Sequence, residues 1–131
     1  MLRTLSLVLL PAALLWAQEL TADPWYSDAQ RLRGEQVYQS NCLVCQGPEG
    51  EATSNWHQPD ADGNLPPPPL NGTAHTWHHS PKSLANTVRK GGKQVGGVMP
   101  GFADSLSLPD MVSVIAYLTS LWPTEVYASW I

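Results

Sequence analysis

The chain has few charged side chains, and the basic ones are the scarcer kind. Its 131 residues include 7 Lys and Arg against 11 Asp and Glu, and no basic run alternates with aromatic residues. Such a run is the usual footprint of a protein that binds nucleic acid, so we expect no nucleic-acid partner. The formal net charge of −4 instead favours a partner protein with a basic docking surface.

The chain also lacks an apolar stretch long enough for a comfortable membrane span, which takes about 20 residues. The N-terminal apolar run over 5–16 is short, and Pro11 interrupts it. Together with one preceding basic residue, this run is typical of a secretory signal. We expect cleavage after Ala17, which gives a signal peptide over 1–17 and one exported domain over 18–131. An uncleaved segment would instead hold the domain at the membrane.

Cysteine is scarce too: the sequence has only Cys42 and Cys45, and Gln46 follows them directly. In an exported chain, one disulfide is the simplest interpretation. A disulfide across two intervening residues closes a very small loop, which gains little stabilisation from chain entropy. Cysteines at this spacing therefore indicate chemistry or a bound group. A histidine at position 46 would complete a covalent haem-attachment motif, but glutamine stands there.

The first expected helix starts at Ser27 or Asp28, either of which can cap it, and runs to about Ser40. A glycine inside a helix costs roughly 1 kcal/mol relative to alanine. We therefore expect another helix to approach the backbone at Gly34, the alternative being a tolerated glycine. Apolar and small residues at three- and four-residue steps predict one buried stripe, made of Leu32, Gly34, Val37, Tyr38 and Asn41.

Two further helices are expected in the second half of the chain. Ser80 is predicted to cap a helix that begins at Pro81 and ends at Gly91. Ser107 is predicted to cap a third helix, which Pro123 ends. The buried face of this third helix is predicted to consist of Met111, Val114, Ile115, Leu118, Leu121 and Trp122.

Long loops separate the expected helices. The loop over 47–79 contains four consecutive prolines, Pro66–Pro69, which can only be extended. Loops of this length are uncommon in a compact domain unless something else, such as a bound cofactor, organises them. Neither this loop nor the one over 91–105 has the alternation of a strand, so we expect an all-α fold.

The order of these features resembles the small class I monohaem cytochromes c, over about 32–122, and in particular a bacterial subgroup. The resemblance implies that one haem c is attached through Cys42 and Cys45, and that Met99, before Pro100, is the distal iron ligand. It also implies a periplasmic carrier of single electrons between transiently docked redox partners. The matching residues are Arg33-Gly34-Glu35, Tyr38, Asn41 to Cys45, Gly47, Gly50, Leu70-Asn71-Gly72, the stretch Gly72 to His79, Met99-Pro100-Gly101-Phe102, and Ile115 to Leu118.

The same resemblance implies a histidine at the proximal iron position, where this chain has Gln46. A glutamine amide binds iron less well than the neutral imidazole does. The iron would then be held by Met99 alone, by Met99 and water, or by a recruited histidine. We expect such an open iron to bind small ligands and to show weak peroxidase-type side activity in a protein that is not an enzyme. The histidines available for recruitment are His57, His75, His78 and His79.

Three alternatives stay open at this point. A zinc or copper site could use both cysteines with two of His75, His78 and His79, although the proline-filled separation is unlike a compact zinc module. A thiol–disulfide oxidoreductase would need a βαβ pattern around the cysteines, and none is visible. A domain that keeps the fold without transferring electrons is the third alternative.

Overall fold

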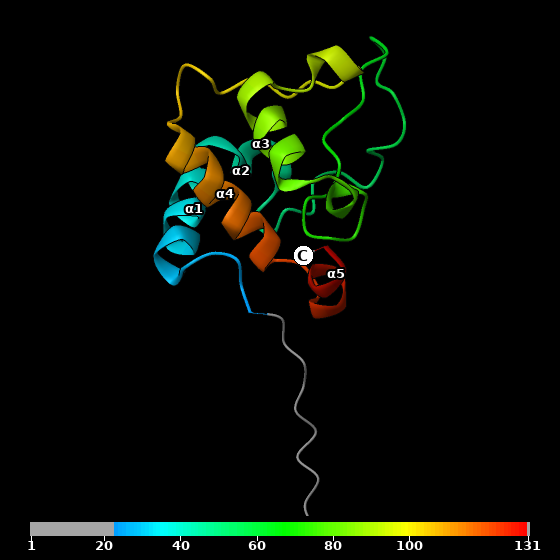
Figure 1. Cartoon of the computed structure of the whole chain (residues 1–131). Helices are drawn as coiled ribbons and strands as arrows, with labels where there is room; N and C mark the ends of the chain where they lie inside the picture. The colour runs from blue at the N-terminus through cyan, green and yellow to red at the C-terminus, as the bar shows by residue number, and fades with distance from the viewer. Residues whose placement is uncertain (1–22, 131) are drawn as a thin grey trace, which may run out of the picture.

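A computed structural model describes residues 23–130, so the predicted signal peptide over 1–17 lies outside the described residues (Figure 1). The described chain consists of helices joined by long loops. Its single β-type pairing is an isolated bridge between Leu65 and Gly97. None of the described helices is long and apolar enough to cross a membrane. The prediction of an all-α fold is confirmed.

Three helices start at the predicted serines. The hydroxyls of Ser27, Ser80 and Ser107 each accept a hydrogen bond from the backbone N–H three residues further on. Such a cap satisfies a donor that has no partner inside the helix, which fixes where the helix begins. The helical segments are α1 (Asp28–Asn41), α2 (Leu43–Gln46), the 3-10 turn η1 (Thr76–His78), α3 (Pro81–Lys90), the 3-10 turn η2 (Lys93–Val95), α4 (Leu108–Ser120) and α5 (Thr124–Trp130).

The helix α5 was not predicted, because Pro123 was interpreted only as a stop. The helix begins at the next residue, and the N–H of Tyr127 donates to the carbonyl of Pro123 at 2.9 Å. The Tyr127 hydroxyl accepts a hydrogen bond from the backbone N–H of Trp25 at 2.9 Å. The Trp130 indole donates to the carbonyl of His79 at 2.7 Å. The helix therefore fastens the start of the described chain and the long loop to the domain.

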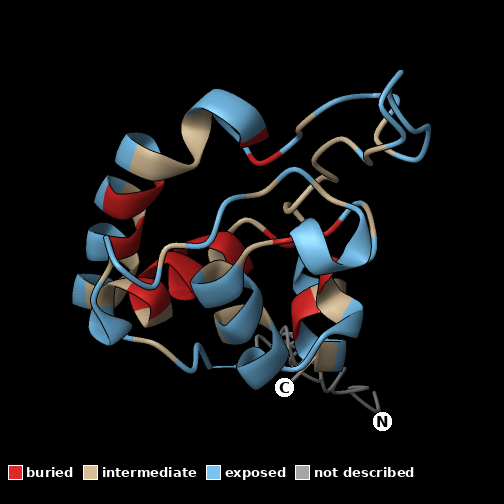
Figure 2. Ribbon diagram, turned by 90° about the horizontal axis from the view of Figure 1, so that it is seen from above, coloured by how far each residue is buried: buried red, intermediate tan, exposed pale blue. Residues whose placement is uncertain are grey.

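The helices α1 and α4 cross at Gly34 and form the core (Figure 1). A Cβ atom on Gly34 would overlap the Ser113 carbonyl oxygen and would lie 2.9 Å from Tyr117 Cβ. The predicted approach of another helix to this glycine is therefore confirmed. Figure 2 shows the buried residues concentrated on α4 and on the side of α1 that faces it. The central cluster consists of Val37, Tyr38, Val114, Tyr117 and Leu118.

The prediction that Leu32 belongs to the buried stripe of α1 was wrong. Leu32 is 50% exposed, while Gly34, two positions later, is buried. Successive residues of an α-helix are rotated by about 100°, so residues two apart point to nearly opposite sides. On α4, the predicted face is buried at Met111, Val114, Ile115 and Leu118. Just beyond the end of the helix, Leu121 is half-buried and Trp122 is buried.

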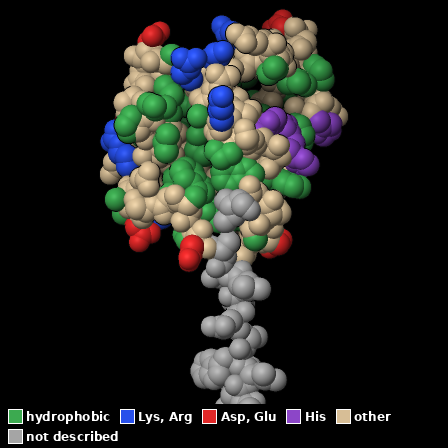
Figure 3. Space-filling view, in the orientation of Figure 1, with side chains coloured by type: hydrophobic (Ala, Val, Ile, Leu, Met, Phe, Trp, Pro, Cys, Tyr) green, Lys and Arg blue, Asp and Glu red, His purple; other side chains and the backbone are tan. Residues whose placement is uncertain are grey.

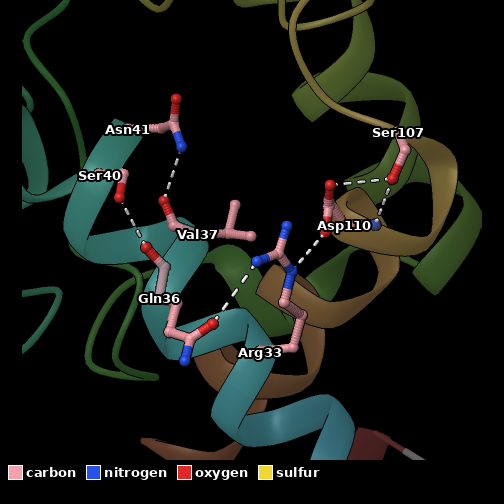
Figure 4. Close-up of polar contacts among 7 residues, drawn as sticks. All are labelled: Arg33, Gln36, Val37, Ser40, Asn41, Ser107 and Asp110. Atoms are coloured by element: carbon pink, nitrogen blue, oxygen red, sulfur yellow. Dashed lines mark hydrogen bonds and ion pairs between the residues drawn. The ribbon is translucent and has the colours of Figure 1, made fainter.

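A polar clamp joins α1 to the first turn of α4 (Figure 4). The Arg33 Nε atom donates to Asp110 Oδ1 at 2.7 Å, and the Ser107 hydroxyl donates to Asp110 Oδ2 at 2.9 Å. The hydrogen bond from Arg33, with the one from Ser107, holds the pKa of Asp110 below its usual range. Because the clamp lies at the surface, water and salt screen it, and it orients the helices more than it stabilises them.

Candidate functional site

The cysteine pair lies in one tight turn where α1 ends and α2 begins. The Cys42 N–H donates to the carbonyl of Tyr38 at 2.8 Å. The Cys42 carbonyl accepts hydrogen bonds from the N–H groups of Cys45 and Gln46, at 3.1 and 2.9 Å. Both thiols are free, that of Cys42 half-buried and that of Cys45 exposed. The pair is therefore held by the backbone rather than by a disulfide, and its sulfur atoms are available for other bonds.

The Cys42 thiol is not activated for disulfide exchange. Burial, with the neighbouring Cys45, raises the pKa of the Cys42 thiol to about 11. The nucleophile in thiol–disulfide exchange is a thiolate, and redox-active pairs lower the pKa of one cysteine. Residues 23–130 also contain no strand that could form a βαβ unit around the pair. Both observations argue against a thiol–disulfide oxidoreductase.

Gln46 is a buried polar residue whose amide oxygen lacks a partner. The residue closes α2 and is only 8% exposed. Its Oε1 atom accepts no hydrogen bond from any described residue. Leaving a buried amide oxygen unpaired costs roughly 1–3 kcal/mol, so native proteins rarely tolerate it without a further bound group or water. This residue directly follows the cysteine pair, and the resemblance to cytochromes c implies that the proximal iron ligand belongs there.

Tyr38 fixes the turn that follows Gln46. Its hydroxyl donates to the carbonyl of Gly47 at 2.6 Å, and its ring packs on Tyr117 with centroids 5.1 Å apart. Gly47 has a φ of 75°, a conformation that favours glycine, and a Cβ there would lie 2.6 Å from the carboxylate oxygens of Glu51. Burial raises the pKa of Tyr38 far above its usual value, so its hydroxyl stays a donor.

Met99 lies in a loop that is pinned to the end of α3. We call residues 91–105 the methionine loop. The Met99 carbonyl accepts a hydrogen bond from the Gly92 N–H at 3.0 Å, and the Phe102 N–H donates to the carbonyl of Val88 in α3 at 3.0 Å. The Met99 side chain is half-buried and is not part of the central cluster. Its thioether is therefore positioned by backbone contacts without being enclosed in the protein core.

The proline run connects the methionine loop to Gly50, which lies four residues after the turn over 42–46 that holds the cysteines, here called the cysteine turn. At one end, the Leu65 N–H donates to the carbonyl of Gly96 at 2.8 Å. At the other end, the Leu70 N–H donates to the carbonyl of Gly50 at 2.7 Å. The intervening Pro66–Pro69 have no N–H and form a stiff extended spacer, which we call the proline strap. Two segments far apart in the sequence are thereby held at a fixed separation.

Half-buried side chains pack against the central cluster, and Cys42 and Leu43 of the cysteine turn are among them. The helix α3 buries no residue fully, although its Leu84, Ala85 and Val88 are half-covered. Two free thiols, a thioether and half-covered apolar side chains are the chemical groups that a large and mostly apolar cofactor such as haem requires. The half-buried residues packed against the central cluster are Cys42, Leu43, Leu70, Val88, Leu106 and Leu121.

The histidines gather on the surface, seen in purple at the right of Figure 3, and they are all exposed. Among residues 23–130, no group of three or more His, Cys, Asp or Glu side chains is arranged to hold a metal ion. The described residues therefore do not bring together the ligands that the zinc or copper alternative requires. Partial burial, with the nearby His79 and His78, lowers the pKa of His75.

Comparison with known proteins gives a consistent result. Two solved structures share the fold, and the chain spans about three fifths of one and half of the other. One is the crystal structure of cytochrome cL from the marine methylotrophic bacterium Methylophaga aminisulfidivorans, with a TM-score of 0.54 and 18% identity over 80% of this chain and 62% of that one. The other is a reducing HAO-like protein complex of Kuenenia stuttgartiensis, with a TM-score of 0.57 and 26% identity over 80% of this chain and 48% of that one. A search of curated protein sequences finds no match.

A family model gives the assignment. The model described as cytochrome c oxidase, cbb3-type, subunit III matches residues 29–118, which is most of the chain. This range contains the cysteine turn, the proline strap, the methionine loop and nearly all of both crossing helices. Membership implies a covalently bound haem c and a role in electron transfer. The chain therefore belongs to this family of cytochrome c domains.

Proposed function

We propose that this chain is an exported electron carrier that holds one haem c through Cys42 and Cys45, with Met99 as the distal iron ligand. The family supports covalent haem and electron transfer. The observation that carries the residue assignment is the pair of free thiols in one turn. The proline strap is fastened to Gly50, just after this turn, and to Gly96 in the methionine loop. The apolar N-terminal run over 5–16 supports export.

The residues around the site would bind the cofactor and set its potential. The thiols of Cys42 and Cys45 would each add across one vinyl group, the sulfur to one carbon and the hydrogen to the other, so that an S–H bond and a C=C π bond are replaced by an S–C and a C–H bond. A bound haem supplies a reversible one-electron change at its iron. The soft sulfur of Met99 favours the reduced state. The half-covered apolar side chains exclude water, which makes the extra charge of the oxidised state costlier and raises the potential further.

Gln46 would weaken the proximal side of the iron. Its amide oxygen is a hard and weak donor, whereas the family motif supplies an imidazole nitrogen. The buried and unpaired Oε1 atom of Gln46 would stand on the proximal side in place of that nitrogen. All four histidines are exposed, and they contact Trp56, Trp77 or one another, so none is held ready as a replacement. We therefore expect a partly open, high-spin iron that binds carbon monoxide or cyanide.

Docking of a redox partner would use the surface around the cysteine turn. Val44, between the two cysteines, is 91% exposed and offers an apolar contact at this surface. The acidic net charge of −4 would steer a basic partner toward the domain. An encounter of this kind is small and transient, as electron transfer between proteins requires.

Absorption spectra of the haem-loaded protein and of Gln46→His test this proposal. We expect a Soret band with a high-spin spectrum in the wild type and a low-spin spectrum in the variant, because an imidazole then binds the iron. A matched control is Gln39→His, which places a histidine on the exposed side of α1 and should leave the absorption spectrum unchanged. Absence of covalent haem would contradict the assigned function. A low-spin wild type with a methionine-to-iron charge-transfer band, unchanged by Gln46→His, would contradict the role of Gln46.

A further inference from the structure

The long loop carries a histidine pair that the haem site does not use. His75 precedes the single turn η1 and His79 follows it, so the two residues are four positions apart. Their ring centroids lie 5.7 Å apart with an interplanar angle of 71°. Both residues are exposed. The imidazole nitrogens are therefore accessible to a ligand from solvent.

The separation of the two rings suits a shared metal ion. An imidazole nitrogen binds a transition metal at about 2.0–2.1 Å, which places the ring centroid a little over 3 Å from the ion. Two rings on one ion then have centroids about 4.5–6.5 Å apart, depending on the angle between the bonds. The observed 5.7 Å between His75 and His79 falls inside this range.

The surroundings hold the pair in place. The ring of Trp56 packs on His75 with centroids 5.3 Å apart. The carbonyl of His79 accepts the hydrogen bond from the Trp130 indole at 2.7 Å. Within the intervening turn, the Thr76 hydroxyl donates to the carbonyl of Pro69 at 3.0 Å, so the turn is fastened to the proline strap. A turn fixed at three points loses little conformational entropy when an ion binds, which favours affinity.

We propose that His75 and His79 form a surface site for one Cu²⁺ ion, separate from the cysteine turn and independent of the proposed function. Imidazole suits copper, and Cu²⁺ binds nitrogen ligands more tightly than the other divalent first-row metals. The structure offers two protein ligands, since no third His, Cys, Asp or Glu among residues 23–130 joins them. Water completes the coordination, so the bound ion is open to exchange and to small ligands.

The neighbouring histidines provide matched controls. His57 also contacts Trp56, with centroids 5.7 Å apart, but its ring is not paired with His75 or His79. His78 stacks on Trp77 with centroids 3.9 Å apart. Both controls are as exposed as the proposed ligands, so a general affinity of surface histidines for copper would involve them equally.

The test is equilibrium dialysis of the full protein against Cu²⁺, with the bound copper counted per chain. The cysteines are blocked beforehand, by attached haem or by alkylation, so that thiols cannot bind the ion. We expect one Cu²⁺ per chain, with nitrogen hyperfine structure in its electron paramagnetic resonance spectrum. Substituting His75→Gln or His79→Gln should lower the affinity at least about tenfold, because each removes one of two ligands. Substituting His57→Gln or His78→Gln should leave it within about twofold.

Three outcomes would overturn the proposal. The first is a wild-type chain that binds no copper. The second is an equal loss of affinity in all four variants, which would indicate unspecific binding by surface histidines. The third is a double variant, His75→Gln with His79→Gln, that binds copper as tightly as the wild type. Circular dichroism of each variant confirms folding, and these exposed positions should tolerate the change.

Discussion

The close crossing of α1 and α4 predicts that Gly34→Ala destabilises the domain, although alanine is the better helix former. The new Cβ would overlap the Ser113 carbonyl oxygen and approach Tyr117 Cβ to 2.9 Å. The Ser113 atoms belong to the backbone of α4, so no change of rotamer can move them aside. The two helices would have to separate along their whole contact.

The magnitude follows from two opposing effects. Overpacking a core typically costs 1–3 kcal/mol, and the upper value of about 3 kcal/mol applies here because backbone atoms clash. The higher helix propensity of alanine returns about 1 kcal/mol. We expect a net loss of about 2 kcal/mol, which lowers the melting temperature of a domain this size by roughly 8 °C or more.

Thermal and denaturant unfolding, followed by circular dichroism at equal haem loading, measure this loss. The matched control is Gln39→Ala, an exposed substitution on the same helix that should change stability by less than about 0.5 kcal/mol. If Gly34→Ala were as stable as the wild type or more so, the two helices would not approach as closely as described. The reasoning about the core would then be refuted.

Two further predictions concern hydrogen bonds. Tyr38→Phe removes the donor to the Gly47 carbonyl and should lower the free energy of unfolding by about 1–2 kcal/mol, measured with denaturant. The control Tyr117→Phe should change it little, because the Tyr117 hydroxyl donates to no described residue. Equal losses in the two variants would contradict this prediction. The lowered pKa of Asp110 means that its pairing with Arg33 contributes stability above the unfolded-state pKa of about 3.9 and loses it as pH falls further. Asp110→Asn should therefore be less stable than the wild type at pH 7 and equal to it at low pH, and a gap that persists in acid would contradict the pairing.

Local signals explain why much of the fold could be predicted. The caps at Ser27, Ser80 and Ser107 act within one helical turn, so the sequence alone predicts where α1, α3 and α4 begin. The glycine at position 34 predicted the helix crossing because no other local feature explains it. The helix α5 was missed because a proline can both end one helix and precede the next.

The arrangement of the site depends on contacts that periodicity does not encode. The proline strap is placed by the hydrogen bonds of Leu65 to Gly96 and of Leu70 to Gly50, between segments distant in sequence. The unpaired oxygen of Gln46 is equally invisible to sequence reasoning, since burial of that side chain follows from packing. The pairing of the exposed His75 and His79 rings likewise could not be predicted, because it depends on the turn η1 between them.

The most direct test of the account is the intact mass of the mature protein, measured for the wild type and for Cys42→Ser and Cys45→Ser. We predict that the wild-type mass exceeds that of its polypeptide by one haem, with neither thiol open to alkylation. The single variants should load haem through one thioether or lose it, and the mass also reports where the N-terminal segment is cleaved. A wild-type chain at the mass of its polypeptide alone, with both thiols alkylated, would contradict the claim that this domain carries covalent haem.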